Sequence, residues 1–157
     1  MINPDLAASA ADLLAAIAHA IDDDALESWP HFFTEDAPYR IVPRESYEAG
    51  DPIGILSCHG RGMMRDRVLA LRTANIYEPH TFCHVLSIPT LSRAADGTLL
   101  SRCNFALYRT QQAGGTMLFA AGKFLDRIVE QNGTLLIGSR EVVLESRRID
   151  ILIVLPI

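Results

Sequence analysis

The sequence has no apolar run long enough to cross a membrane. Its longest run, at residues 151–157, is far shorter than the ~20 residues that a transmembrane helix needs. The N-terminal stretch MINPDLAAS also lacks the basic and apolar segments of a secretory signal. We therefore predict a soluble protein that is neither inserted into a membrane nor exported.

Cysteine is scarce as well. The three cysteines, Cys58, Cys83 and Cys103, are an odd number at wide spacing, which is not the pattern of a disulfide framework. No disulfide is needed, because a chain of 157 residues can bury roughly two thirds of its unfolded surface in one core. We expect a single domain over residues 1–157, located in the reducing cytoplasm.

Clustered positive charge is also missing. The net charge is -5 at pH 7, and the arginines are scattered among acidic residues. A nucleic-acid-binding protein usually presents a basic face. The composition therefore argues against a nucleic-acid partner.

Helical periodicity is present at the start of the chain. Asn3 and Pro4 have the positions of an N-cap and of the first helical residue. Apolar residues then recur every three or four positions, at Leu6, Ala10, Leu13, Leu14, Ile17 and Ile21. Asp22, Asp23 and Asp24 end this helix. We interpret them as caps for a second, short helix and not as a calcium site, because calcium ligands usually alternate along a loop.

The next segment contains two helices joined by a strand and a loop. The apolar residues on one side of the second helix are Leu26, Trp29 and Phe33. A first strand follows at residues 39–42 and ends at Pro43. Residues 44–62 are predicted as a loop with a short strand near residues 53–57, because glycine and proline interrupt them. Apolar residues at helical spacing then predict a third helix from Met63 to near Asn75.

Strand signals fill the second half of the chain. Residues 82–91 fit a strand with Pro89 at an edge or a bulge. Residues 99–109 fit its partner across a turn at Asp96-Gly97. A loop at residues 111–115 then leads into the last hairpin.

That last hairpin organises the predicted sheet. Asn132-Gly133 is the strongest turn signal, because this dipeptide readily takes the positive φ at both positions of a type I′ turn. Simple alternation places one apolar set on one face of each strand, namely Leu118, Ala120, Phe124 and Ile128, and then Leu136, Val142 and Leu144. Other apolar residues lie on the opposite faces, so both faces must be covered. Gly122 and Gly138 interrupt the two runs and favour a bend or bulge.

The chain ends on apolar residues. Residues 149–155 alternate like a strand and lead to Ile157, where chains more often fray into polar tails. We expect this terminus to be buried.

Helices that precede antiparallel strands indicate an α+β fold, with the N-terminal helices packed on one face of a strongly curved, mainly antiparallel sheet. This order resembles the cone-like sheet of the nuclear transport factor 2 (NTF2) superfamily, as a fold analogy alone.

The sequence has no convincing pattern of metal ligands. Cys58-His59 and Cys83-His84 look like paired ligands, but adjacent residues on a strand point to opposite faces. The spacing of a Rieske cluster is absent, and no local spacing favours a two-histidine, one-carboxylate iron site. We therefore predict no metal and no cofactor on this chain.

His84 is the best candidate for acid–base chemistry inside the cone. It lies in an apolar strand, where burial and a neighbouring charge can tune its pKa. The residues proposed to flank it are Asp66, Arg67, Asp126 and Tyr39. A strand histidine is nevertheless more often a structural group. Nucleophilic catalysis and phosphate binding lack their sequence signatures altogether.

With these residues placed, nearly the whole chain resembles the small (β) subunit of aromatic-ring-hydroxylating dioxygenases, the Rieske non-haem iron oxygenases. Three segments carry the resemblance: LESWPHFFTEDAPYRI at residues 26–41, MMRDRVLALR at residues 63–72 with His80 and His84 following, and FLDRIVEQNGTLLIGSREVVLESRRIDILIVLPI at residues 124–157. The third is the most specific, because an NG hairpin, an R-x-V-x-L strand and a short apolar end occur in order. Among relatives, the chain is most similar to subunits of oxygenases for aromatic carboxylates such as terephthalate.

The resemblance implies a subunit without its own active site. Its partner is a large (α) subunit that holds the Rieske [2Fe-2S] cluster and the catalytic non-haem iron. The family typically forms a hetero-hexamer in which three small subunits make a trimer. The resemblance therefore implies a role in assembly and stabilisation. Relatives often place a basic residue directly before the histidine that matches His84, whereas this chain has Cys83 there.

Two other functions fit the same fold. One is an autonomous dehydratase, isomerase or hydrolase that uses His84 with an acidic partner. The other is a small-ligand binding protein without catalysis. A neighbouring gene for a Rieske large subunit would favour the dioxygenase subunit over both.

Overall fold

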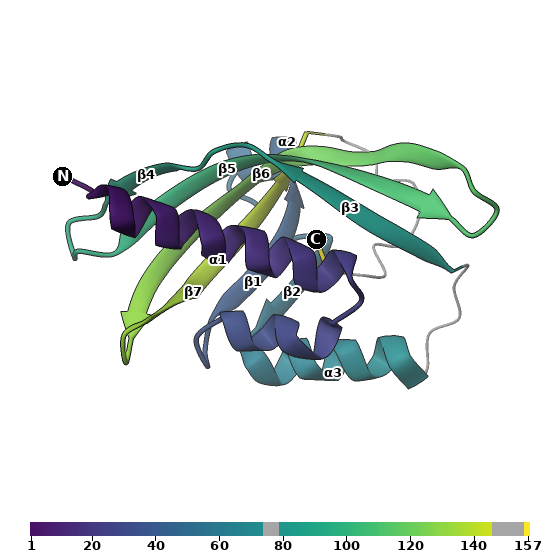
Figure 1. The fold of residues 1–157 in the computed structure, drawn as a ribbon, viewed down its shortest axis with the longest axis horizontal. Helices are drawn as coiled ribbons and strands as arrows, with labels where there is room; N and C mark the ends of the chain where they lie inside the picture. The colour runs from purple at the N-terminus through teal and green to yellow at the C-terminus, as the bar shows by residue number, and fades with distance from the viewer. Residues whose placement is uncertain (74–78, 146–155) are drawn as a thin grey trace.

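The computed structural model describes residues 1–73, 79–145 and 156–157. Its helices are α1 (Pro4–Asp22), the 3-10 helix η1 (Leu26–Phe32), α2 (Arg44–Glu48) and α3 (Arg61–Thr73). Its strands are β1 (Pro38–Pro43), β2 (Leu56–His59), β3 (His80–Leu86), β4 (Thr90–Arg93), β5 (Leu99–Gln111), β6 (Thr116–Gln131) and β7 (Thr134–Leu144). Figure 1 shows α1, η1 and α3 on one side of a long sheet.

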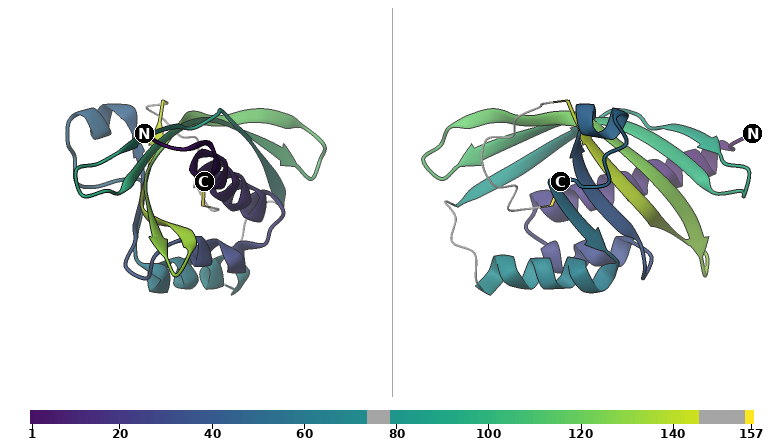
Figure 2. Two further views of the ribbon diagram at one scale, coloured as in Figure 1. Left: turned by 60° about the vertical axis from the view of Figure 1, so that its left-hand side comes forward. Right: turned by 180° about the vertical axis from the view of Figure 1, so that it is seen from behind.

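The strands form one curled sheet. Their order is β2-β1-β7-β6-β5-β3, and β4 pairs with β5 beyond the end of β3. All pairs are antiparallel except β1 with β7. The sheet curls around α1, which is seen nearly end-on in the left view of Figure 2. This arrangement confirms the predicted α+β fold with a cone-like, mainly antiparallel sheet.

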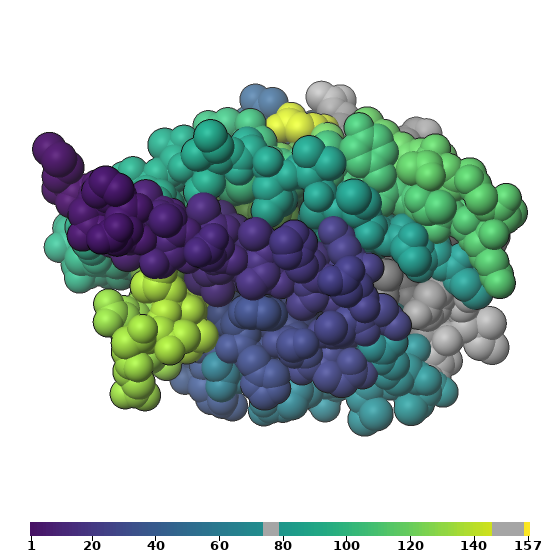
Figure 3. Space-filling model, in the orientation of Figure 1, coloured from purple at the N-terminus to yellow at the C-terminus, as the bar shows by residue number. Residues whose placement is uncertain are grey.

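The first helix fills the concave side of this sheet. The side chain of Asn3 accepts a hydrogen bond from the Leu6 amide at 2.7 Å, so the predicted N-cap is confirmed. By length and composition α1 passes the test for a membrane-spanning helix. Its apolar residues Ala10, Leu14 and Ile17 are nevertheless at most 2% exposed in the protein core. In the space-filling view of Figure 3, α1 packs directly against the strands above it.

The last hairpin turns where the sequence predicts. Asn132 and Gly133 have φ values of 52° and 78°, as a type I′ turn requires. Gly138 is an extra residue in β7, because Arg127 pairs with Ser139 while Ile128 pairs with Ile137. Such a bulge bends the strand and increases its twist.

Because of two bulges, the residues on the inner face of β6 and β7 differ from those predicted. Leu118 is 57% exposed instead of facing inward with Ala120, because the register of β5 and β6 shifts beside it. Similarly, Ile137 and not Leu136 shares the inner face with Val142, because the Gly138 bulge reverses the alternation. The prediction from simple alternation was wrong at both sites, because a bulge adds one residue to a strand and so moves every residue beyond it to the opposite face.

Three other predictions need correction. Residues 44–62 contain α2 and a strand at Leu56–His59 in place of a strand at 53–57. The short α2 buries no residue, so it leaves no periodic signal. Pro89 separates β3 from β4, where one strand was predicted. The N-cap of η1 is Ala25, without a side-chain hydrogen bond, so the three preceding aspartates are not its caps.

Two predictions fall outside the described residues: the end of the third helix near Asn75 and the strand at residues 149–155. The final residue can be placed, however. Ile157 is 0% exposed, and its C=O and N–H groups bind the Tyr39 hydroxyl at 2.8 and 2.9 Å. Tyr39 itself packs edge-to-face against Trp29 and Phe33. The expected burial of the terminus is therefore confirmed at Ile157, and the left view of Figure 2 shows the C-terminus within the curl of the sheet.

Candidate functional site

The structure places His84 against the end of α1. His84 lies in the middle of β3, opposite Leu107 of β5, and its side chain is fully buried. Its Nδ1 lies 2.6 Å from Oδ1 of Asp22, the last residue of α1. The backbone N–H of His84 donates to the other oxygen, Oδ2, at 2.9 Å. One carboxylate therefore holds both the ring and the backbone of the histidine.

The second ring nitrogen of His84 has no hydrogen-bond partner within residues 1–73, 79–145 and 156–157. Nε2 is buried, and the ring lies 6.4 Å from the ring centres of Phe105 and Phe124. A carboxylate on Nδ1 favours a proton there, which leaves Nε2 as an acceptor. Such a pair has the chemistry of an oriented general base. In this conformation, however, the imidazole exposes no surface to a substrate.

The acidic partner of His84 differs from the residues proposed from the sequence. Asp126 pairs with Arg140, and Tyr39 binds Ile157. For Asp66 and Arg67 on α3, the described contacts include none with His84. Asp22 was missed because it lies 62 residues away in sequence and looked like part of a capping cluster.

Asp126 and Arg140 form a second buried polar pair. They are direct neighbours on β6 and β7, and two hydrogen bonds of 2.8 and 2.9 Å join the guanidinium to the carboxylate. The guanidinium also lies 4.1 Å from the ring centre of Phe124. Burial raises the pKa of the Asp126 carboxyl, and Arg140 offsets part of that rise. The two side chains hydrogen-bond to each other, so we treat the pair as structural.

In each of the two Cys-His pairs, the side chains lie on opposite faces of the strand, as predicted. Cys58 is buried while His59 is exposed, and Cys83 is exposed while the His84 side chain is buried. Burial raises the pKa of the Cys58 and Cys103 thiols, which keeps them protonated. Among the described residues, no group of three or more histidine, cysteine and acidic side chains is arranged to hold a metal ion.

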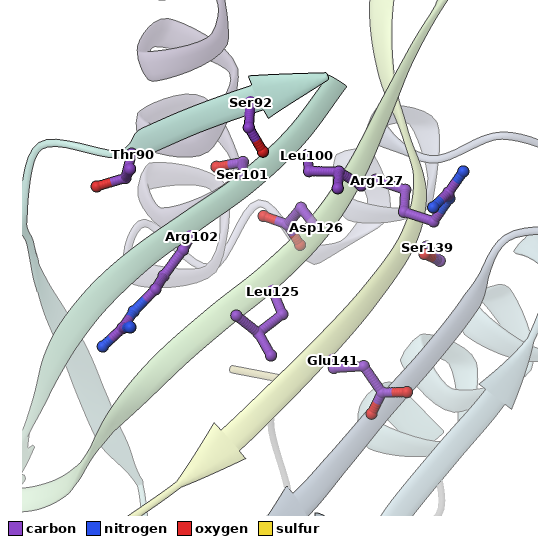
Figure 4. A pocket seen from close by; sticks show the side chains of 10 residues that line it. All are labelled: Thr90, Ser92, Leu100, Ser101, Arg102, Leu125, Asp126, Arg127, Ser139 and Glu141. Carbon is purple, nitrogen blue, oxygen red and sulfur yellow. The ribbon is translucent and has the colours of Figure 1, made fainter. Parts of the chain in front are cut away.

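A groove of about 460 Å³ lies on the outer face of the sheet, across β4 to β7 (Figure 4). Arg102 and Leu125 face each other across β5 and β6, and their neighbours in sequence, Cys103 and Phe124, point into the core. The groove is therefore on the opposite side of the sheet from His84. We call it the outer groove.

Comparison with known proteins gives a consistent result. The family model described as "Ring hydroxylating beta subunit" matches residues 17–151. The anthranilate 1,2-dioxygenase small subunit of Burkholderia cepacia is 38% identical over 137 residues, which cover 87% of this chain and 85% of that protein. The terephthalate 1,2-dioxygenase terminal oxygenase subunit beta 1 of Comamonas sp is 38% identical over 144 residues, which cover 91% of this chain and 93% of that protein.

A solved structure agrees over the same length. It is a protein from Novosphingobium aromaticivorans assigned as the β subunit of an aromatic-ring-hydroxylating dioxygenase. It has 31% sequence identity and a TM-score of 0.83, and the match covers 91% of each chain.

Proposed function

The chain belongs to the ring-hydroxylating dioxygenase β-subunit family, and we propose that it assembles with and stabilises the large subunit of such an oxygenase. The observation that carries this proposal is the family match over residues 17–151, supported by relatives 38% identical over nearly their whole length. The chain is then one component of an oxidoreductase, and this component has no complete active site of its own.

The metal centres of the oxygenase belong on the large subunit in this proposal. A Rieske [2Fe-2S] cluster needs cysteine and histidine ligands that converge on one point. The Cys-His pairs of this chain instead send one side chain inward and one outward. The described residues therefore do not fit the cluster, and the large subunit would supply both the cluster and the catalytic iron.

The named relatives support a proposal for the substrate class. Anthranilate and terephthalate are both aromatic carboxylates, so we propose that the assembled oxygenase dihydroxylates a compound of this class. Substrate selection would then lie mainly with the large subunit. We also propose a cytoplasmic hetero-hexamer in which three copies of this chain form a trimer.

The rival functions have less support. An autonomous dehydratase, isomerase or hydrolase would need a substrate to reach Nε2 of His84, yet that side chain is fully buried. A small-ligand binding protein would need an open cone, yet Ile157 and α1 pack inside it. Neither rival explains a family match over most of the chain.

Expression with and without the large subunit tests the proposal. With both chains present, the oxygenase should be isolated as a stable complex that turns over an aromatic carboxylate. Without this chain, the large subunit should be poorly soluble or inactive. A large subunit that is equally stable and active alone would contradict the proposal, as would stoichiometric iron in this chain when it is purified alone.

A further inference from the structure

The outer groove contains an exposed arginine. Three arginines lie on or beside this part of the outer face. Arg127 pairs with Asp96 at 2.8 Å, and Arg40 pairs with Glu141 at 2.8 Å. Arg102 is exposed and has no ion pair among the described residues. Its planar guanidinium can bind a carboxylate with two parallel hydrogen bonds.

The surroundings of Arg102 combine apolar and polar groups. Leu100 and Leu125 are half-buried and line the groove, while Thr90 and Ser92 of β4 contribute exposed hydroxyl groups. Figure 4 shows these side chains on neighbouring strands, with the guanidinium of Arg102 at the edge of the group and directed away from Ser92 and Leu100. An apolar centre with a polar, solvent-accessible rim is the usual anatomy of a protein–protein interface.

The exposure of the rim favours a macromolecular ligand. Sites for small molecules usually enclose most of the ligand surface. Here Thr90, Ser92 and Arg102 are all exposed, so a small molecule would remain largely in water. Nucleic acid is disfavoured, because Arg102 is the one cation without an ion pair among the described residues that line the groove, and the net charge of the chain is -5.

We propose that the outer groove receives an acidic segment of the large subunit. Arg102 pairs with an aspartate or glutamate of that segment, and a neighbouring apolar side chain packs on Leu100 and Leu125. This inference rests on the proposed function, because it identifies the surface through which the assembly forms.

The test uses variants of this chain co-expressed with an affinity-tagged large subunit. Arg102→Glu should lower the amount of co-purified chain by about tenfold or more, because an attraction between opposite charges becomes a repulsion between like charges. Arg102→Gln should have a smaller effect, and Ser92→Trp should also reduce binding by filling the groove. The matched control is Arg93→Glu, which makes the same charge change on β4 outside the groove. It should co-purify like the wild type.

The outcomes separate the two proposals. If the wild type fails to co-purify, the proposed function itself is wrong. If the wild type binds and both Arg102→Glu and Ser92→Trp bind equally well, only the groove assignment is wrong. If Arg102→Glu breaks contacts between copies of this chain but keeps the contact with the large subunit, the ligand of the groove is a second copy, and the assignment is overturned. Equal melting temperatures for the isolated variants would show that their fold is intact.

Discussion

At the scale of single residues, two interior polar pairs each join two elements of the fold. Asp22 ties the end of α1 to the middle of β3 through His84, and Asp126 ties β6 to β7 through Arg140. Both pairs are mostly or wholly buried, where an unpaired partner would be costly. Each pair joins two elements, and the sequence alone does not show that these residues are in contact.

Replacing His84 distinguishes a structural role from a catalytic one. His84→Ala keeps the backbone hydrogen bond to Asp22 but removes the ring contact. We expect a stability loss of ~1–3 kcal/mol, because a carboxylate oxygen loses its buried partner. Turnover of the assembled oxygenase should change by much less than the ~10²-fold loss expected for a general acid or base. His31→Ala, at an exposed position, is the control. A loss of ~10²-fold in correctly folded protein would indicate catalysis.

Replacing Tyr39 tests the anchor of the terminus. Tyr39→Phe removes the hydroxyl that binds both backbone groups of Ile157 while it keeps the aromatic packing. The unfolding free energy should fall by ~1–3 kcal/mol, because a buried N–H and C=O lose their partner. Thermal unfolding of the variant and of Tyr47→Phe, an exposed tyrosine, measures the difference. Equal melting temperatures would show that the Ile157 contact contributes nothing.

At the scale of elements, glycines set the curvature of the sheet. At Gly122 the carbonyl oxygen of Val143 occupies the space that a Cβ would need, so β6 and β7 approach closely there. At Gly138 an extra residue bends β7. These two positions account for part of the curl that lets one sheet surround α1.

Two matched glycine substitutions test this explanation. Gly122→Ala forces a methyl group against the backbone of β7 and should destabilise the protein by ~1–3 kcal/mol. Gly62→Ala lies in helix α3 with open space around it, so it should stabilise the protein by ~0.5–1 kcal/mol. Denaturant unfolding of both variants gives the two values. A Gly122→Ala protein as stable as the wild type would mean that the close approach is not required.

Strong local signals explain which elements the sequence predicts well. The Asn3-Pro4 start, the stripe of α1 and the Asn132-Gly133 turn all depend on neighbouring residues, and all were predicted correctly. The errors arise where non-local packing decides. The bulge beside Leu118 reverses a face without any local marker, and the Asp22–His84 pair joins residues 62 positions apart. The groove around Arg102 was not predicted, because it forms only when four strands align.

At the scale of the whole molecule, the cone is filled from within and has a groove on its outer face. α1 and Ile157 pack inside the curl, while the outer groove carries Arg102, an exposed arginine without an ion pair in the part of the chain that the structure describes. A subunit with a filled interior, whose outer groove we propose as a surface for the large subunit, suits assembly better than catalysis. This agrees with the family to which the chain belongs.

The mass of the purified complex tests this account most directly. The two chains should be co-expressed, purified through a tag on the large subunit and measured by native mass spectrometry. The account predicts equal numbers of both chains, with the mass of three large subunits and three copies of this 17.3 kDa chain. A large subunit that is isolated without this chain, at concentrations where both are soluble, would contradict it.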